Sequence, residues 1–241
     1  SPSGYTKSIV DFVAGVLRDM SFPVQVTRKQ TVLSVLSEGA HPVVLMAHLD
    51  TLGAIIRSIK SNGRIRLSKI GGYSEGTIDG ENCLVHTRDG KMISGTIQSI
   101  HPSVHVYDDV STLTRAEKNV ELILDEKTES TQDTLRLGIQ VGDIVSFDPR
   151  TRITSSGFIK SRHLDDKAGA GILLAIAKWI HLEKPCLKRK VTLAFTSYEE
   201  VGHGGSSCFT DQEEEMISVD MGAIGEDLQG KETSVSICAK D

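Results

Sequence analysis

The sequence predicts an α/β domain that is interrupted by a small β domain. Strand and helix patterns alternate near both ends of the chain, over residues 1–53 and 155–241. Between them, residues 54–154 carry short β-type runs separated by frequent turn signals, as is typical of an all-β unit. We therefore expect the first and third segments to fold together as one α/β domain, with the β domain inserted between them.

The first segment predicts a helix and three strands. Apolar residues recur at helical spacing over residues 5–20, which indicates a helix with one apolar face. Two short β-type runs follow, at 24–27 and 31–36. The unbroken apolar run 42–47 is too short for a typical helix and is bounded by turn signals, so it predicts a strand buried on both faces. This strand leads directly into His48.

The inserted segment is recognised by its turns. Residues 55–59 and 64–67 flank Ser61-Asn62-Gly63 as a predicted hairpin. Further turn signals follow at Gly71-Gly72, Asp79-Gly80, Asp89-Gly90 and Val141-Gly142-Asp143. This density of turns favours a small barrel or sandwich. Residues 111–133 fit a short helix, a strand or a loop, and their pattern does not decide among the three.

The third segment returns to longer elements. Residues 169–180 predict a helix that is apolar on most sides and therefore buried. Residues 190–197 and 216–219 read as strands, and the second of these ends at Asp220.

Composition excludes several classes of protein. The 241 residues are 39% apolar and 24% charged, which is ordinary for a globular protein. The net charge of −5 and the lack of a Lys/Arg-rich run argue against nucleic acid as a partner. No apolar run approaches the ~20 residues of a membrane helix, so we expect no membrane partner. The cysteines Cys83, Cys186, Cys208 and Cys238 form no C-x-x-C pair, which predicts free thiols and a cytoplasmic protein.

Acidic residues and one histidine follow the predicted strands. His48 and Asp50 come after the first buried strand, Glu199-Glu200 after the second, and Asp220 after the third, while Asp165-Asp166 precedes a helix. Ligands bind at the carboxyl ends of strands in open α/β sheets, so we expect these side chains to converge. Packed carboxylates repel unless cations neutralise them. Oxygen-rich sites with one His per metal suit zinc, cobalt or manganese, and two bridged ions are the usual hydrolase arrangement.

Each motif taken alone has a simpler interpretation. Asp165-Asp166 could cap a helix, Glu199-Glu200 could be a solvated turn, and Asp220 could cap a loop. The metal hypothesis is favoured because all of these groups occur together at strand ends.

The chain resembles the TET-type co-catalytic metallo-aminopeptidases, a group that is also labelled glutamyl aminopeptidase or endoglucanase-M-like. The matching segments, spread over essentially the whole chain, are Ser1-Pro2-Ser3-Gly4, Ala47-His48-Leu49-Asp50, Ile70-Gly71-Gly72, Val141-Gly142-Asp143, His163-Leu164-Asp165-Asp166-Lys167-Ala168-Gly169, Glu199-Glu200-Val201-Gly202 and Val219-Asp220. The resemblance implies a mixed-sheet, zinc-peptidase-like catalytic domain interrupted by a PDZ-like or barrel-like β domain. It also implies peptide substrates, two divalent metal ions per subunit and a homo-oligomer in the form of a dodecameric shell.

The resemblance further implies a role for each residue of the site. Zinc or cobalt would be the metal, with manganese as an alternative. The implied metal ligands are His48, Asp165, Glu200 and Asp220, with Asp165 bridging the two ions. Glu199 would be the general base, and Asp50 would orient the His48 ring. The peptide bond between Asp165 and Asp166 is expected to be cis.

Two rival functions stay open at this point. One is a related metal-dependent deacylase or dipeptidase, and the other is a catalytically inactive assembly subunit that keeps the fold. The chain departs from the family pattern at Thr51 and at His203-Gly204-Gly205, which leaves the preferred N-terminal residue of the substrate undetermined.

The resemblance also predicts that the chain is a fragment. It starts inside the Ser-Pro-Ser-Gly motif, whereas related enzymes begin with a further helix. They also continue beyond Asp241 with sheet strands and with a histidine that completes the second metal site. All eight histidines here precede Asp220, so we expect that ligand to be missing, with His203 as the only substitute.

Overall fold

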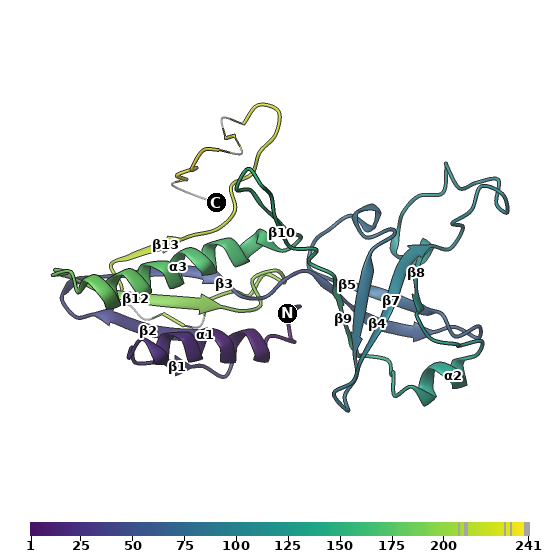
Figure 1. Ribbon diagram of the computed structural model, residues 1–241, viewed down its shortest axis with the longest axis horizontal. Helices are drawn as coiled ribbons and strands as arrows, with labels where there is room; N and C mark the ends of the chain where they lie inside the picture. Colours follow the sequence, from purple (N-terminus) through teal and green to yellow (C-terminus); the bar gives the residue numbers. More distant parts are fainter. Residues whose placement is uncertain (207, 210–211, 229, 232, 239–241) are drawn as a thin grey trace.

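The computed structural model describes residues 1–206, 208–209, 212–228, 230–231 and 233–238 (Figure 1). These residues form a five-stranded sheet covered by two helices, and a separate closed barrel of six strands. The architecture confirms the prediction of an α/β domain with an inserted β-rich unit, and the unit is a barrel.

The sheet has the order β1-β2-β12-β3-β13. Its strands are β1 (Gln25–Val26), β2 (Val32–Ser37), β3 (Ala40–His48), β12 (Arg189–Thr196) and β13 (Glu215–Ser218). Strands β12 and β13 both run parallel to β3, whereas β2 is antiparallel to β12. The carboxyl ends of β3, β12 and β13 therefore lie at the same edge of the sheet.

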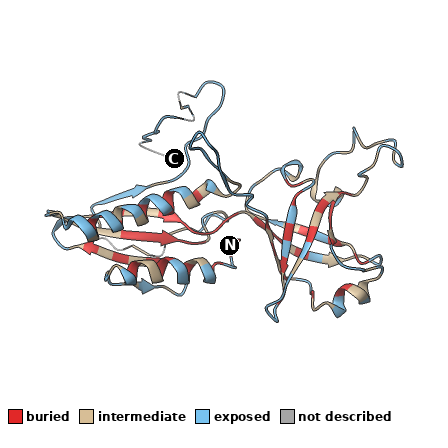
Figure 2. Cartoon of the chain, viewed as in Figure 1, coloured by how far each residue is buried: buried red, intermediate tan, exposed pale blue. Residues whose placement is uncertain are grey.

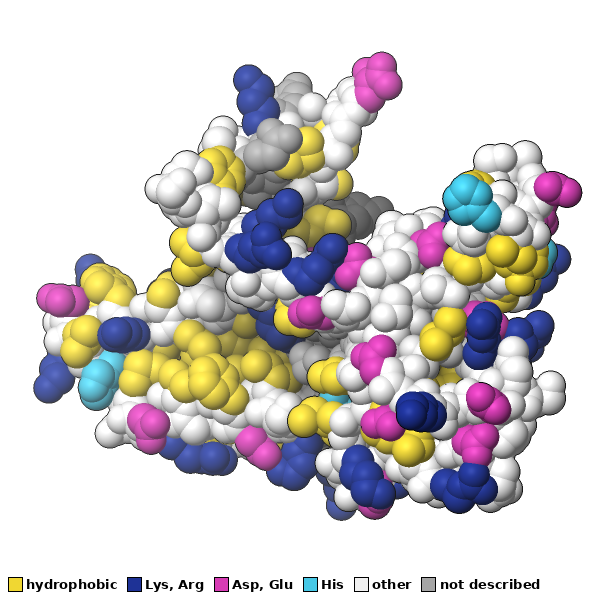
Figure 3. Space-filling view, turned by 45° about the vertical axis from the view of Figure 1, so that its right-hand side comes forward, with side chains coloured by type: hydrophobic (Ala, Val, Ile, Leu, Met, Phe, Trp, Pro, Cys, Tyr) yellow, Lys and Arg dark blue, Asp and Glu magenta, His cyan; other side chains and the backbone are white. Residues whose placement is uncertain are grey.

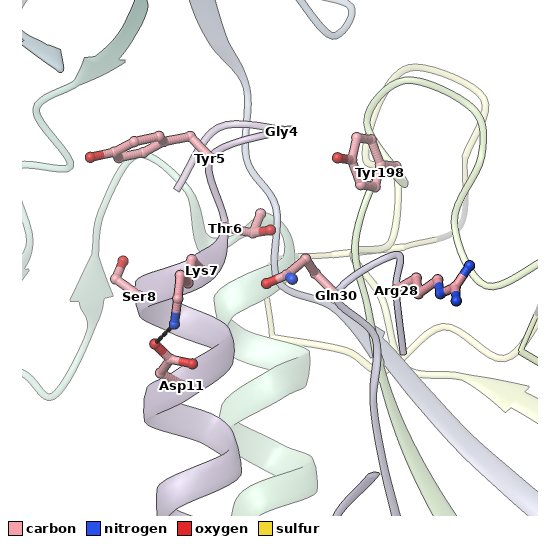
Figure 4. A pocket seen from close by; sticks show the side chains of 9 residues that line it. All are labelled: Gly4, Tyr5, Thr6, Lys7, Ser8, Asp11, Arg28, Gln30 and Tyr198. Atoms are coloured by element: carbon pink, nitrogen blue, oxygen red, sulfur yellow. Dashed lines mark hydrogen bonds and ion pairs between the residues drawn. The ribbon is translucent and has the colours of Figure 1, made fainter. Parts of the chain in front are cut away.

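Helices α1 (Lys7–Asp19) and α3 (Leu164–Glu183) pack side by side on one face of this sheet (Figure 4). In α1 the buried residues are Val10, Val13, Ala14 and Leu17, whose spacing places them on a single face of the helix. They share one core with Leu173 of α3 and with Phe195 of β12. The helix expected at residues 5–20 and the strand expected at 42–47 are thus confirmed.

The expectation that the third-segment helix is buried on most sides is wrong. Helix α3 buries Ala170, Leu173 and Ala177 against the sheet and α1. Its other side leaves Trp179 and Leu182 more than half exposed. Figure 3 shows hydrophobic side chains gathered on one face of the sheet domain. A helix that rests on one face of a sheet buries only one of its own sides, and apolar composition alone does not reveal how many sides are covered.

The barrel has the strand order β4-β5-β8-β7-β6-β9, and its pairs are antiparallel. Its strands are β4 (Gly53–Ile59), β5 (Ile65–Ile70), β6 (Asn82–His86), β7 (Met92–Ser99), β8 (Val120–Leu124) and β9 (Ile144–Phe147). The predicted hairpin around Ser61-Asn62-Gly63 is the β4–β5 pair. The barrel thus spans most of the segment that was expected to be all-β.

The undecided stretch at residues 111–133 contains more than one kind of element. It holds the short 3₁₀ turn Glu117–Asn119, strand β8 and the start of helix α2 (Thr131–Arg136). A further 3₁₀ turn, Glu75–Thr77, precedes β6. Strands β10 (Arg152–Ile153) and β11 (Ile159–Lys160) form a small exposed hairpin that connects the barrel to α3.

The two units have separate hydrophobic cores (Figure 2). Among the described residues, no helix is long and apolar enough to cross a membrane. All four cysteines are free in the structure, as the sequence predicted, and only Cys83 is fully buried.

Candidate metal centre

The strand-end residues converge at the carboxyl edge of the sheet. His48 is the last residue of β3 and lies in register with Thr196, the last residue of β12. The backbone N–H of Leu49 donates to the Thr196 carbonyl over 2.8 Å, and that of Val219 donates to Met46 over 2.8 Å. The segments that follow all three strands are therefore held next to one another.

His48 lies at the centre of this edge with a side chain that is only 2% exposed. Its Nδ1 donates to the Asp50 carbonyl over 3.0 Å and lies 3.5 Å from Asp50 Oδ1. Its Nε2 lies 2.9 Å from Asp165 Oδ1 and 3.7 Å from Glu199 Oε2. Because Nδ1 is occupied by Asp50, Nε2 is the nitrogen that faces the carboxylates.

Asp50 connects the ends of two strands. Its carboxylate is fully buried. The hydroxyl of Ser3 donates to its Oδ2 over 2.5 Å. The backbone N–H of Glu199 donates to Oδ1 over 3.2 Å, and that of Glu200 donates to Oδ2 over 3.3 Å. One buried carboxylate therefore fixes the His48 ring and the backbone of both adjacent glutamates.

The Asp165–Asp166 peptide bond is cis, as the family resemblance implied. Both carboxylate oxygens of Asp166 accept backbone N–H groups, from His48 and from Gly169, each over 3.0 Å. A Cβ atom at Gly169 would lie 2.3 Å from both Asp166 Oδ1 and the Val219 carbonyl. Glycine is thus required where the start of α3 meets the end of β13.

The donor atoms form two groups that share His48. His48, Asp165 and Glu200 offer ligand atoms within 4.8 Å of one another, and so do His48, Asp166 and Asp220. The structure thus brings together all four residues that the sequence nominated as metal ligands, with Glu199 and Asp50 beside them. We call the seven residues of these contacts the acidic cluster: His48, Asp50, Asp165, Asp166, Glu199, Glu200 and Asp220.

The acidic cluster sets six carboxyl groups against one imidazole, that of His48. Burial, followed by the charge of Asp165, raises the pKa of Glu200 to about 7. Burial, followed by the charge of Asp220, raises the pKa of Asp166 to about 7. Burial lowers the pKa of the His48 imidazole, but its hydrogen bonds to Asp165 and Asp50 outweigh burial and raise that pKa to about 11.

These shifts describe a site that favours a bound cation. Several carboxylates that resist ionisation face a single imidazole, which holds a proton beside Asp165. A divalent ion would take the place of that proton and relieve the repulsion. One imidazole nitrogen with several carboxylate oxygens is a donor set that zinc, cobalt and manganese accept, so the residues present fit such ions.

Three residues at the site were not assigned a role from the sequence. Asp166 was recognised only as the neighbour of Asp165. Ser3 belonged to a matched motif, yet its bond to Asp50 joins residues far apart in the chain. Lys167 donates to the Leu49 carbonyl, and burial lowers its pKa to about 8.

A pocket of about 620 Å³ lies at the start of α1 (Figure 4). It is bounded by the start of α1, by Arg28 and Gln30 of the turn between β1 and β2, and by Tyr198. Tyr198 directly precedes Glu199, but the described residues that line the pocket include none of the cluster itself. The pocket is therefore distinct from the acidic cluster.

The chain is similar to known peptidases in sequence and in fold. The chain is 42% identical over 243 residues to YhfE of Bacillus subtilis strain 168, which is named as an aminopeptidase; the match covers 100% of this chain and 70% of that protein. A solved aminopeptidase of Desulfurococcus kamchatkensis is 24% identical with a TM-score of 0.82, over 97% of this chain and 62% of that one.

The TET1 peptidase of Pyrococcus horikoshii is 26% identical, with a TM-score of 0.77 over 91% of this chain and 64% of its own. The chain therefore spans less than two thirds of either solved structure. The model of the M42 glutamyl aminopeptidase family matches residues 31–241, which include the whole acidic cluster. This chain belongs to the M42 glutamyl aminopeptidase family.

Proposed function

We propose that this protein is a two-metal aminopeptidase that removes N-terminal residues from peptides, with Glu199 as the general base. The observation that carries the proposal is the grouping of ligand atoms from His48, Asp165 and Glu200 within 4.8 Å, with Glu199 beside His48. We infer that His48, Asp165, Glu200 and Asp220 hold two divalent ions, with zinc or cobalt favoured and manganese as an alternative.

Two such ions would lower the pKa of a bound water toward ~7 and would polarise the carbonyl of the scissile bond. The remaining chemistry belongs to the side chains. The Glu199 carboxylate, half exposed and 3.7 Å from His48 Nε2, accepts a proton from the attacking water and passes it to the leaving amine. Asp50 keeps this carboxylate in place through the Glu199 backbone N–H.

Asp165 is better suited than Asp166 to bridge two ions. Both oxygens of Asp166 already accept backbone N–H groups, and the side chain is 1% exposed. The Asp165 side chain is 43% exposed, and its Oδ1 lies 2.9 Å from His48 Nε2. The second carboxylate oxygen of Asp165, Oδ2, is thus available to a second ion.

The bridging role predicts unequal metal loss in two variants. Asp165→Ala should lose both ions, because each loses a ligand, whereas Glu200→Ala should mainly lose one. Metal analysis of the purified variants by mass spectrometry measures the two stoichiometries. Loss of one ion in each variant would show that Asp165 serves a single ion.

A panel of fluorogenic aminoacyl amides, applied to the metal-reconstituted full-length protein, tests the proposed activity. We expect hydrolysis of substrates with a free α-amine, no hydrolysis of their N-acetylated forms, and loss of activity with a chelator. Hydrolysis of the acetylated forms would favour a deacylase instead. Two tightly bound ions without any hydrolysis would favour an inactive assembly subunit.

The same proposal covers the partners of the protein. The Pyrococcus horikoshii TET1 peptidase can assemble into a tetrahedron or a large octahedral shell. We propose that this protein also forms a homo-oligomer, with peptides as substrates and with neither nucleic acid nor membrane as a partner, and that it acts in the cytoplasm.

A further inference from the structure

The barrel contacts the segment that leads into the acidic cluster. This segment, residues 162–165, follows the β10–β11 hairpin, includes the first two residues of α3 and ends at Asp165. We call it the Asp165 arm. Its first residue, Arg162, has a side chain that is only 17% exposed, which is unusual for an arginine outside a protein core.

Arg162 is held by the barrel through three kinds of contact. Its Nη2 donates to the Thr77 carbonyl over 2.6 Å and pairs with Glu81 Oε1 over 3.1 Å. Its guanidinium lies 5.8 Å from the centre of the Phe147 ring, within the range of a cation–π contact. Thr77, Glu81 and Phe147 all belong to the barrel unit, whereas Arg162 begins the Asp165 arm.

The buried charges of Arg162 and Glu81 depend on each other for compensation. Glu81 Oε2 and Arg162 Nε are buried and lack a hydrogen-bond partner among the described residues. Glu81 is 10% exposed and also accepts from Arg150 over 2.9 Å, but the Arg150 side chain is 58% exposed. Removal of Glu81 would therefore leave the Arg162 charge buried with little compensation. Removal of Arg150 would take away a largely exposed arginine and leave Glu81 paired with Arg162.

The barrel also contacts the acidic cluster at Glu200. At Gly71, in the turn that follows β5, a Cβ atom would lie 3.3 Å from the Glu200 carbonyl and 3.5 Å from Glu200 Cβ. The backbone of Gly71 has a φ of 86°, which favours glycine. The barrel thus contacts both the Asp165 arm, through Arg162, and the backbone of Glu200, through Gly71.

We propose that the barrel is part of the scaffold of the metal centre, and that Glu81 acts as a positioning residue which holds the Asp165 arm through Arg162. The expected effect on metal affinity rests on the proposed metal-dependent function, whereas the contact between Glu81 and Arg162 does not. Groups that orient metal ligands typically change metal affinity by about 10–100-fold when they are removed. We expect a loss in this range, without direct contact between Glu81 and an ion.

The test compares Glu81→Ala with the matched control Arg150→Ala. Titration of Co²⁺ and Zn²⁺ into the metal-free proteins by calorimetry measures affinity, and hydrogen exchange with mass spectrometry measures protection of residues 160–166. We expect weaker binding by about 10–100-fold and faster exchange in Glu81→Ala, and wild-type behaviour in Arg150→Ala. The conservative variant Glu81→Gln, which keeps the volume and a hydrogen-bond acceptor, should fall between the two.

The two readouts separate this inference from the proposed function. Unchanged exchange and unchanged metal affinity in Glu81→Ala would overturn the positioning role. A wild-type protein that binds neither ion would overturn the metal-dependent function, while the exchange data would still decide whether the barrel holds the arm. If Glu81→Ala fails to fold, the same comparison is made between Glu81→Gln and Arg150→Ala, and equal values would refute the proposal.

Discussion

Replacement of Glu199 by glutamine is expected to lower kcat by about 10²–10⁴, the usual contribution of a general base. Glutamine has nearly the same shape but cannot accept the proton of the attacking water. The backbone N–H of residue 199 would still donate to Asp50, so the position of the neighbouring Glu200 should be kept. Steady-state kinetics on a free-amine aminoacyl amide measures the loss.

Metal content is the control for this variant. Glu199→Gln should bind as much metal as the wild-type protein, because Glu199 is not among the ligands that we propose. Glu200→Gln, one residue further along, should instead lose metal. Wild-type turnover in Glu199→Gln would refute the assignment of the base.

Replacement of Asp50 by alanine is expected to affect both activity and stability. The buried carboxylate accepts from Ser3 and from the backbone of Glu199 and Glu200, and it lies against the His48 ring. Its loss leaves these buried donors without an acceptor. We expect the free energy of unfolding to fall by about 3–5 kcal/mol, the usual cost of removing one partner of a buried ionic contact. Activity should fall by about 100-fold or more, since both His48 and Glu199 lose their orientation.

Ser3→Ala is the matched control for Asp50→Ala. It removes one donor to the same carboxylate and leaves its other contacts, so the expected loss is about 1.5–3 kcal/mol, typical of a hydrogen bond to a charged group. Urea unfolding measures both variants. An equal loss in the two variants would show that Asp50 contributes little beyond its bond to Ser3.

The position of the site was predictable because ligands bind at the carboxyl ends of strands in open α/β sheets. Parallel strands present their carboxyl ends at one edge, so His48, Glu199-Glu200 and Asp220 could be expected to meet once three strands had been recognised. Asp165 follows no strand. It was nevertheless expected to converge with these residues, its bridging role was implied by the resemblance, and the structure brings its Oδ1 within 2.9 Å of His48 Nε2.

Other features could not be predicted, since they depend on contacts between distant residues. The pair between Glu81 and Arg162 joins a charged residue of the barrel to one of the sheet domain, and nothing in the local pattern of either residue indicates a partner. The closure of the barrel depends on the β4–β9 pairing, which residue alternation within each strand does not specify. Periodicity likewise described α3 as apolar but did not show which side the sheet would cover.

The position of the barrel in the chain limits how it can be exchanged between relatives. The chain enters the barrel at Gly53, shortly after His48, and leaves it after Phe147 to reach Asp165. Under the proposed positioning role, a chimaera that receives a foreign barrel needs counterparts of Glu81 and Gly71 to keep Asp165 and Glu200 in place. The loop at residues 100–116, where Val104 is 71% exposed, supplies none of the contacts to Arg162 or Glu200 and therefore suits an affinity tag or a label.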